Sequence, residues 1–311
     1  MQPKASVIPG RLSDTDLRLL RVFKAVADCG GMAAAELDLD IATSTISRHV
    51  KDLEARLGLT LCRRGRSGFA LTPEGEKVYA AAQELLSATE SFRRSLHEIH
   101  RGLGGELHVA VFEKTATNPR ARIPEAIASF RAEAPAVSMH VHVGSIAAIE
   151  RGVLSGQFQV GIIPEHRRSE SLVYHALFDE SMRLYVGRHH PWFATRYPNL
   201  GWDELRGQPL VGLGYHSPNM ILTHDKRLER AASASDQEGI ALLVLSGCYV
   251  GFLPDHYAEP FVRAGRMRAV APKALRYECQ FSAIHRRAPA LSVAAERFRA
   301  TLVAAHREVV R

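Results

Sequence analysis

The segment IATSTISRHVKDLEARLG, residues 41–58, constrains the fold more than any other part of the chain. On a helix of about 100° per residue, its apolar side chains form one stripe, which consists of Ile46, Val50, Leu53 and Leu57. The opposite side carries hydroxyl groups and cations, although hydroxyl residues are mediocre helix formers. The pattern predicts a helix that packs through its stripe and presents its other face to a polar, anionic partner.

Two shorter helical segments precede this helix. An apolar stripe between residues 19 and 27 ends at CGG, residues 29–31, and an Ala-rich stretch follows over residues 32–37. Three short helices with the polar-faced one third are typical of a helix-turn-helix. Downstream, two short apolar pieces flank the basic run RRGRSG, which predicts a hairpin or wing.

Positive charge is concentrated on the third helix and the wing, where residues 48–66 contain six Lys or Arg against two acids. Cations bind phosphates, and polar side chains read base edges. The candidate DNA-binding residues are Thr43, Ser44, Ser47, Arg48, His49, Lys51, Arg63, Arg64 and Arg66. The competing interpretation is a set of solvated surface groups, and His49 in particular either flanks the groove or only covers the helix.

A long helix is predicted over residues 72–101, with Thr72 as its N-cap and Pro73 at its first position. Its apolar side chains repeat at alternating spacings of four and three: Val78, Ala82, Leu85, Thr89, Phe92, Leu96 and Ile99. Such a seam is typical of a coiled coil. Because a small domain offers nothing to cover it, we expect a second subunit to do so.

Residues 12–101 resemble the DNA-binding head and linker helix of LysR-type transcriptional regulators. The motifs that carry the resemblance are ISRHVKDLEARLG, then LCRR, then LTPEG. The chain departs from the family pattern at three places. Glu36 replaces the second of two alanines, Ala42-Thr43 stands for Ser-Gln, and Cys62 replaces Phe. Thr43 lacks the bidentate contact to adenine that Gln makes.

The remaining two hundred residues alternate short strands and helices. The strand-like runs are ELHVAVF, VSMHVHV and FQVGIIP, separated by helices near residues 119–134 and 146–155, which predicts a parallel sheet. A second unit runs from MRLYVG through QPLVGLG, helices near 218–231 and 237–245, and CYVGFLP. CQFSAIHRR then returns, and a last helix covers about 291–310.

Two lobes with the chain crossing between them resemble the effector domain of the same family, which is similar to periplasmic binding proteins. LSGCYVGFLP resembles the family's G-x-G-x-x-x-L-P step, with Gly247, Leu253 and Pro254 in place, while Cys248 and Val250 depart from its commonest spelling. The fold class is therefore α/β: a winged helix-turn-helix, a long linker helix and a two-lobed effector domain. The expected boundaries are 12–71, 72–101 and 105–311, with lobe I at about 105–180 and 282–311 and lobe II at about 181–281.

A small effector would bind between the lobes, at strand ends and helix N-termini. The candidate effector-binding residues are Thr115, Thr117, Ser145, His216 and Ser217. The alternative is that Thr117 and Asn118 simply cap a helix. The cations Lys114, Arg120 and Arg122 favour an organic anion, whereas Asp236 and Glu238 would instead select an amine.

Other classes of protein find less support. The chain has no G-x-S-x-G, phosphate-loop or H-E-x-x-H motif, so an enzyme is not expected. A metal sensor would need partners for the pairs His140/His142 and His189/His190, and no Cys or Glu stands at a set spacing. Cys248 and Cys279 lack flanking cations, so we expect buried, inert thiols.

The expected protein is a cytoplasmic, sequence-specific DNA-binding regulator without a cofactor. Scattered cysteines, no secretory signal and no apolar run of about 18 residues support that location and exclude a membrane partner. The net charge of +7 is compatible with a polyanion partner. The resemblance implies an imperfect inverted-repeat operator on double-stranded DNA and a homodimer or homotetramer. The alternative is a thiol-redox or metal-responsive regulator of the same fold.

Overall fold

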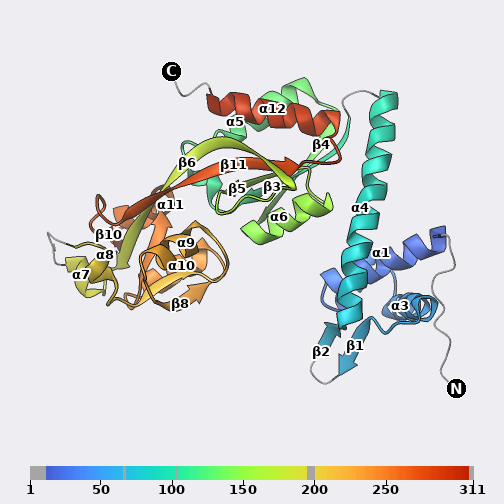
Figure 1. The fold of residues 1–311 in the computed structure, drawn as a ribbon, viewed down its shortest axis with the longest axis horizontal. Helices are drawn as coiled ribbons and strands as arrows, with labels where there is room; N and C mark the ends of the chain where they lie inside the picture. Colours follow the sequence, from blue (N-terminus) through green and yellow to red (C-terminus); the bar gives the residue numbers. More distant parts are fainter. Residues whose placement is uncertain (1–11, 66–67, 102–103, 195–199, 308–311) are drawn as a thin grey trace. The chain divides into compact units, whose positions relative to one another are not determined.

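The computed structural model describes residues 12–65, 68–101, 104–194 and 200–307, and the chain divides near residue 93 into two compact units (Figure 1). The first unit contains three helices, a two-stranded wing and the beginning of a long helix. Their bounds are α1 Asp14–Asp28, α2 Met32–Leu39, α3 Thr43–Leu57, β1 Cys62–Gly65, β2 Gly68–Leu71 and α4 Pro73–Arg101. The winged helix-turn-helix expected from the sequence is confirmed.

The core of the head is formed where α3 turns its apolar stripe inward. Ile46, Val50 and Leu53 are buried, and the partly buried Leu57 packs against the cluster that contains Leu53. A buried carboxylate ties α3 to α1, since the Arg56 Nε donates to Asp16 Oδ1 at 2.7 Å. Hydrogen bonds from Ser13, and then from Arg56, lower the pKa of Asp16 to about 2. The apolar stripe and this ion pair thus anchor α3 to the rest of the head.

The start of α4 is fixed by the TPEG motif. Thr72 donates its hydroxyl to the Thr60 carbonyl at 2.6 Å and accepts the Gly75 N–H at 2.9 Å, which confirms Thr72 as the N-cap. A Cβ on residue 75 would lie 2.1 Å from the Leu61 carbonyl oxygen. Glycine is required there because the helix packs directly on the backbone.

The apolar seam of α4 has two parts with different surroundings. Val78, Ala82 and Leu85 pack into the same cluster as Leu19 and Phe23 of α1. The expectation that the head cannot cover this seam is therefore wrong for its first half, because α1 lies against it. Farther along, 65% of the Phe92 side chain is exposed. The side chains of residues 96 and 99 lie outside the described residues.

The second unit is built on a mixed sheet. Within the described residues nine strands join it, eight of them in the order β4-β3-β5-β11-β6-β9-β7-β8, with β10 paired to β6. The strands are β3 Gly105–Phe112, β4 Val137–Gly144, β5 Val160–Pro164, β6 Leu172–Gly187, β7 Leu210–Leu213, β8 Arg230–Ala234, β9 Val250–Pro254, β10 Met267–Ala269 and β11 Arg276–Arg286. β3 is parallel to β4 and β5, as predicted, whereas β6 and β11 run antiparallel to each other.

Helices connect and cover these strands. Their bounds are α5 Ile123–Glu133, α6 Ile146–Ser155, α7 Pro191–Ala194, α8 Trp202–Leu205, α9 Pro218–Asp225, α10 Gln237–Leu245, α11 Asp255–Arg263 and α12 Val293–Arg307, with a 3-10 turn η1 at Thr115–Thr117. The last helix, α12, returns to the first lobe, where Phe298 meets Phe130 of α5 edge to face at 5.4 Å between ring centroids. Among the described residues, no helix combines the length and the hydropathy that a membrane crossing requires.

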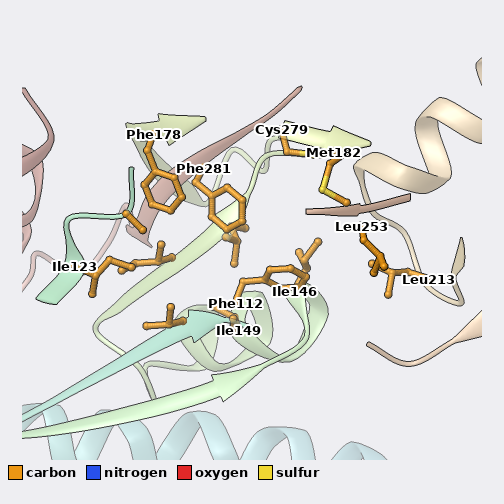
Figure 2. Close-up of a cluster of buried hydrophobic side chains, with 14 of the residues drawn as sticks. Phe112, Ile123, Ile146, Ile149, Phe178, Met182, Leu213, Leu253, Cys279 and Phe281 are labelled. Atoms are coloured by element: carbon orange, nitrogen blue, oxygen red, sulfur yellow. The ribbon is translucent and has the colours of Figure 1, made fainter. Parts of the chain in front are cut away.

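The long strands β6 and β11 run through both lobes (Figure 1). Their side chains make one continuous core, in which the stacked rings of Phe178 and Phe281 lie 4.8 Å apart (Figure 2). Phe112 of β3 joins this core from the first lobe, and Leu253 of β9 joins it from the second. The two lobes are therefore connected by shared strands and by shared packing.

One predicted helix is wrong in its second half. Residues 218–231 were expected to be helical, but α9 ends at Asp225 and β8 begins at Arg230. The Arg230 guanidinium donates to the Leu213 carbonyl at 2.6 Å and to Thr223 Oγ1 at 3.0 Å. Pairing with β7 and these bonds outweigh local helix propensity, because tertiary contacts override weak preferences.

Candidate DNA interface and effector site

The face of α3 opposite the buried stripe carries the polar residues that the sequence singles out. Ser44, Arg48 and Lys51 are exposed, and Ser47 is partly buried between them. They follow helical spacings of three and four residues, so the structure brings them onto one surface. This surface combines hydroxyl donors with two cations, which is the chemistry of phosphate and base-edge contact.

Thr43, at the start of α3, contacts a residue of the neighbouring helix α2 on the surface of the head. Its hydroxyl donates a hydrogen bond to the Glu36 carboxylate of α2. Both residues are departures from the LysR pattern, and the structure places them in contact. The carboxylate that replaces an alanine thus orients the hydroxyl that replaces a glutamine.

His49 and the wing complete the candidate DNA interface. His49 is partly buried, and its Nδ1 atom is inaccessible and has no hydrogen-bond partner in the part of the chain that the structure describes. Arg63 is exposed on β1, whereas the Arg64 side chain and Arg66 lie outside the described residues. Glu54 of α3 accepts the N–H groups of Leu61 at 2.7 Å and Cys62 at 3.3 Å. These two bonds fix the start of the wing to α3.

Among the described residues, three of the five candidate effector side chains form hydrogen bonds to the backbone alone. Thr115 is buried and donates to the Phe112 carbonyl at 3.2 Å. Ser145 caps α6 by accepting the N–H of residue 148, and the fully buried Ser217 caps α9 in the same way, both at 3.3 Å. Ser145 and Ser217 are therefore helix caps, and Thr117, for which capping was the alternative, also donates to the Lys114 carbonyl at 3.0 Å.

The other two candidates lie where the lobes meet. Thr117 Oγ1 lies 2.8 Å from His256 Nδ1, and His256 Nε2 lies 2.9 Å from the buried Glu180 carboxylate. His216 Nδ1 lies 2.6 Å from His166 Nδ1, and His166 Nε2 lies 3.0 Å from Glu150 of α6. The Thr117–His256 and His166–His216 contacts thus link the lobes, and a histidine of each contact also meets a carboxylate.

Sequence reasoning missed an acidic residue at the end of β3. Glu113 Oε1 accepts the Gln237 N–H of α10 at 2.8 Å, which joins the two lobes at a third point. Burial raises the pKa of Glu113 to about 7, and the nearby Asp236 contributes to the rise. The sequence signal that could have identified Glu113 was an acidic residue directly after a buried strand. We call Glu113, Thr117, His216, Gln237 and His256 the lobe junction.

The charges around the lobe junction are largely paired. Lys114 Nζ donates to Glu238 at 2.8 Å and lies 4.8 Å above the centre of the Tyr257 ring. Arg122 is bonded to Glu125 at 2.7 Å. In contrast, the Tyr215 hydroxyl and the Gln237 Oε1 are buried without a hydrogen-bond partner among the described residues. Buried polar groups of this kind normally have partners, so they are available to a ligand.

The cysteines fit the expectation only in part. Cys279 is buried in β11, and burial raises the pKa of its thiol well above the ordinary value. Cys248 is exposed in the turn between α10 and β9, so the expectation that it is buried is wrong. The turn brings it to the surface because the strand begins only at Val250.

Comparisons with known proteins agree with this architecture. Residues 17–76 match the model of the bacterial regulatory helix-turn-helix protein, lysR family, and residues 100–307 match the LysR substrate binding domain. The chain belongs to the LysR family of transcriptional regulators. As in the family generally, a DNA-binding head is joined to a domain through which a small effector modulates operator binding.

Among curated relatives, the HTH-type transcriptional activator BauR of Pseudomonas aeruginosa is 39% identical over 93% of this chain and 95% of its own. The solved structure of CbnR, a LysR family regulator, covers 93% of this chain and 99% of its own with a TM-score of 0.64 and 22% identity. Full-length CbnR in complex with its target DNA aligns with a TM-score of 0.61, 22% identity and coverage of 94% and 99%. At such identity the structures show the shared fold.

Proposed function

We propose that this regulator reads its operator with the outward face of α3 and with the wing. The observation that carries the assignment is the exposed row of Ser44, Arg48 and Lys51 behind the buried stripe of the same helix. Ser47, Thr43 and His49 lie beside this row, and Arg63, Arg64 and Arg66 of the wing supply phosphate contacts. The domain boundaries given above are part of the same proposal.

Two copies of the chain would hold two heads over one operator. The exposed Phe92 on α4 marks the half of the apolar seam that α1 leaves uncovered, and a second α4 would bury it. Paired heads read an imperfect inverted repeat in successive major grooves. We expect Phe92→Asp to lower the mass measured by sedimentation and to weaken operator binding. An unchanged mass would refute a dimer formed through this part of α4.

The effector would bind at the lobe junction. The side chains there indicate which charge the effector carries. The organic anion suggested by the sequence relied on Lys114, Arg120 and Arg122, and two of these cations, Lys114 and Arg122, are paired with carboxylates. Glu113 and the unpartnered oxygens of Tyr215 and Gln237 favour a ligand that donates hydrogen bonds and carries positive charge. We therefore propose a small amine, with Thr117 and His216 at the rim of its site.

A thermal-shift screen of the full chain tests the charge of the effector. A ligand at a hundredfold its dissociation constant stabilises the protein by about 2.7 kcal/mol, which is easily detected. We expect shifts from small amines and amino acids and none from simple carboxylates. Shifts from carboxylates alone would restore the organic anion.

The position of the effector site is tested by Thr117→Val. The substitution removes the hydroxyl that meets His256, so we expect operator binding without the response to effector. An unchanged dose–response curve would remove Thr117 from the site. We further propose that the protein acts by binding alone, in the cytoplasm and without a cofactor. Effector binding would shift a pre-existing equilibrium between lobe arrangements.

A further inference from the structure

A cluster of histidines and one carboxylate lies on β4, at one edge of the sheet of the effector domain, and on the neighbouring strand β3. β3 and β4 are parallel and in register, so that His108 lies directly opposite His140. Their rings stack with centroids 4.6 Å apart. Because side chains alternate along a strand, Glu106 and His142 project from the same face of the sheet. We call these four residues the histidine cluster.

Three of the four side chains converge on one point. Ligand atoms of Glu106, His108 and His140 all lie within 4.8 Å of one another. Glu106 Oε2 is 3.5 Å from His108 Nε2. Two ligand atoms of a single tetrahedral Zn²⁺ are about 3.4 Å apart, because each lies about 2.0–2.1 Å from the ion. The Glu106–His108 pair already has this spacing, and small rotations of the exposed His140 would close the rest.

His142 is placed to orient the imidazole of His108 for binding a metal. Its Nε2 lies 3.3 Å from His108 Nδ1, while its ring rests on Phe158 with centroids 4.9 Å apart. If the His108 Nδ1–H donates to His142, the lone pair of His108 is on Nε2, on the side of Glu106. Metal-binding histidines normally donate their second N–H in this manner.

We propose that Glu106, His108 and His140 form a binding site for a divalent transition-metal ion, with Zn²⁺ as the reference ion. Two imidazoles and a carboxylate leave at least one position for water or a further ligand, and imidazole ligands suit Zn²⁺, Ni²⁺ and Cu²⁺. His142 is a positioning residue. The site lies within β3 and β4, whereas the lobe junction begins beyond the end of β3 at Glu113. The metal site is therefore separate from the lobe junction, and the proposal does not depend on the identity of the effector.

Titration calorimetry of the full chain with ZnCl₂, after removal of metal by a chelator, tests the proposal. We expect the wild-type protein to bind one Zn²⁺ per chain at this site with micromolar affinity. His108→Ala and His140→Ala should each abolish that binding event. His142→Phe should weaken it by about 10- to 100-fold, as expected for a group that orients a ligand. Circular dichroism of each variant checks that it is folded.

The matched control is His224→Ala, since His224 is an exposed histidine at the end of α9 and lies outside the cluster. This variant should bind Zn²⁺ as the wild type does. Retained binding in His140→Ala would overturn the proposal, because its side chain is exposed and its loss should leave the sheet intact. Failure of the wild type to bind Zn²⁺ more tightly than the His108→Ala variant would overturn it as well. With Co²⁺ as the probe, a visible absorption band lost only in the cluster variants would support it.

Discussion

The head and the effector domain present their functional side chains in opposite ways. In the head, the candidate contacts lie on successive turns of α3 and face outward, supported by a stripe a few residues away. In the effector domain, groups from distant segments meet one another: Glu113 and Gln237 are separated by 124 positions, and Thr117 and His256 by 139. On the proposed assignments, specificity for DNA would be a local property of this sequence, whereas the response to an effector would depend on the tertiary structure.

The largest expected effect comes from removing an outward-facing cation of the head. Arg48→Ala should lose about 1–3 kcal/mol per head, so that two heads on one operator lose about 30-fold or more in affinity. Ser47→Ala should weaken binding in the same direction. Gel-shift titrations at fixed salt measure the change, with Arg21→Ala, an exposed cation on α1, as the control. If both variants retained full affinity, α3 would not present the face assigned to it.

A smaller effect is expected from an inward-facing group of the effector domain. Glu113 has a folded-state pKa of about 7, above its ordinary 4.5, so its ionisation costs stability as pH rises from 4.5 to 7. After allowance for partial exposure, Glu113→Gln should stabilise the chain at pH 8 by about 1–2 kcal/mol, and much less at pH 4.5. Urea denaturation at both pH values measures the difference. A gain of equal size at both would contradict the assigned pKa.

The same variant separates the two regions functionally. Glu113→Gln should leave operator affinity unchanged while it abolishes the thermal shift caused by amines. For the wild-type chain, the apparent affinity for an amine should rise between pH 6 and pH 8, since Glu113 becomes ionised near pH 7. A flat pH profile would mean that the amine does not contact this carboxylate.

The smallest expected effect concerns the contact between Glu36 and Thr43, which joins two neighbouring helices of the head. The double variant Glu36→Ala with Thr43→Gln should gain a preference for adenine at one operator position of about 1 kcal/mol, roughly fivefold. Thr43→Gln alone should gain less, because Glu36 competes for the new amide. Binding to operators randomised at each position measures the preference. Equal gains in the two variants would show that Glu36 does not restrain residue 43.

The features that could be predicted from the sequence are the local ones, and the features that were missed depend on tertiary contacts. The stripe of α3 and the Thr72 cap were predictable because helical periodicity and capping act over a few residues. β8 was missed because its strand depends on pairing with β7, and Glu113 was missed because its partner is on α10. His140 and His142 were singled out as a pair, but the partners Glu106 and His108 appear only when β3 and β4 are paired in register.

The placement of β11 and α12 has a consequence for the order in which the chain can fold during synthesis. β11 lies between β5 and β6, and Phe298 of α12 packs on Phe130 of α5. The first lobe is thus completed only when β11 and α12 have left the ribosome, whereas the head is complete long before. Domains fold as units once their residues have emerged. A nascent regulator would therefore possess a finished DNA-binding surface before it has finished the domain through which it is controlled.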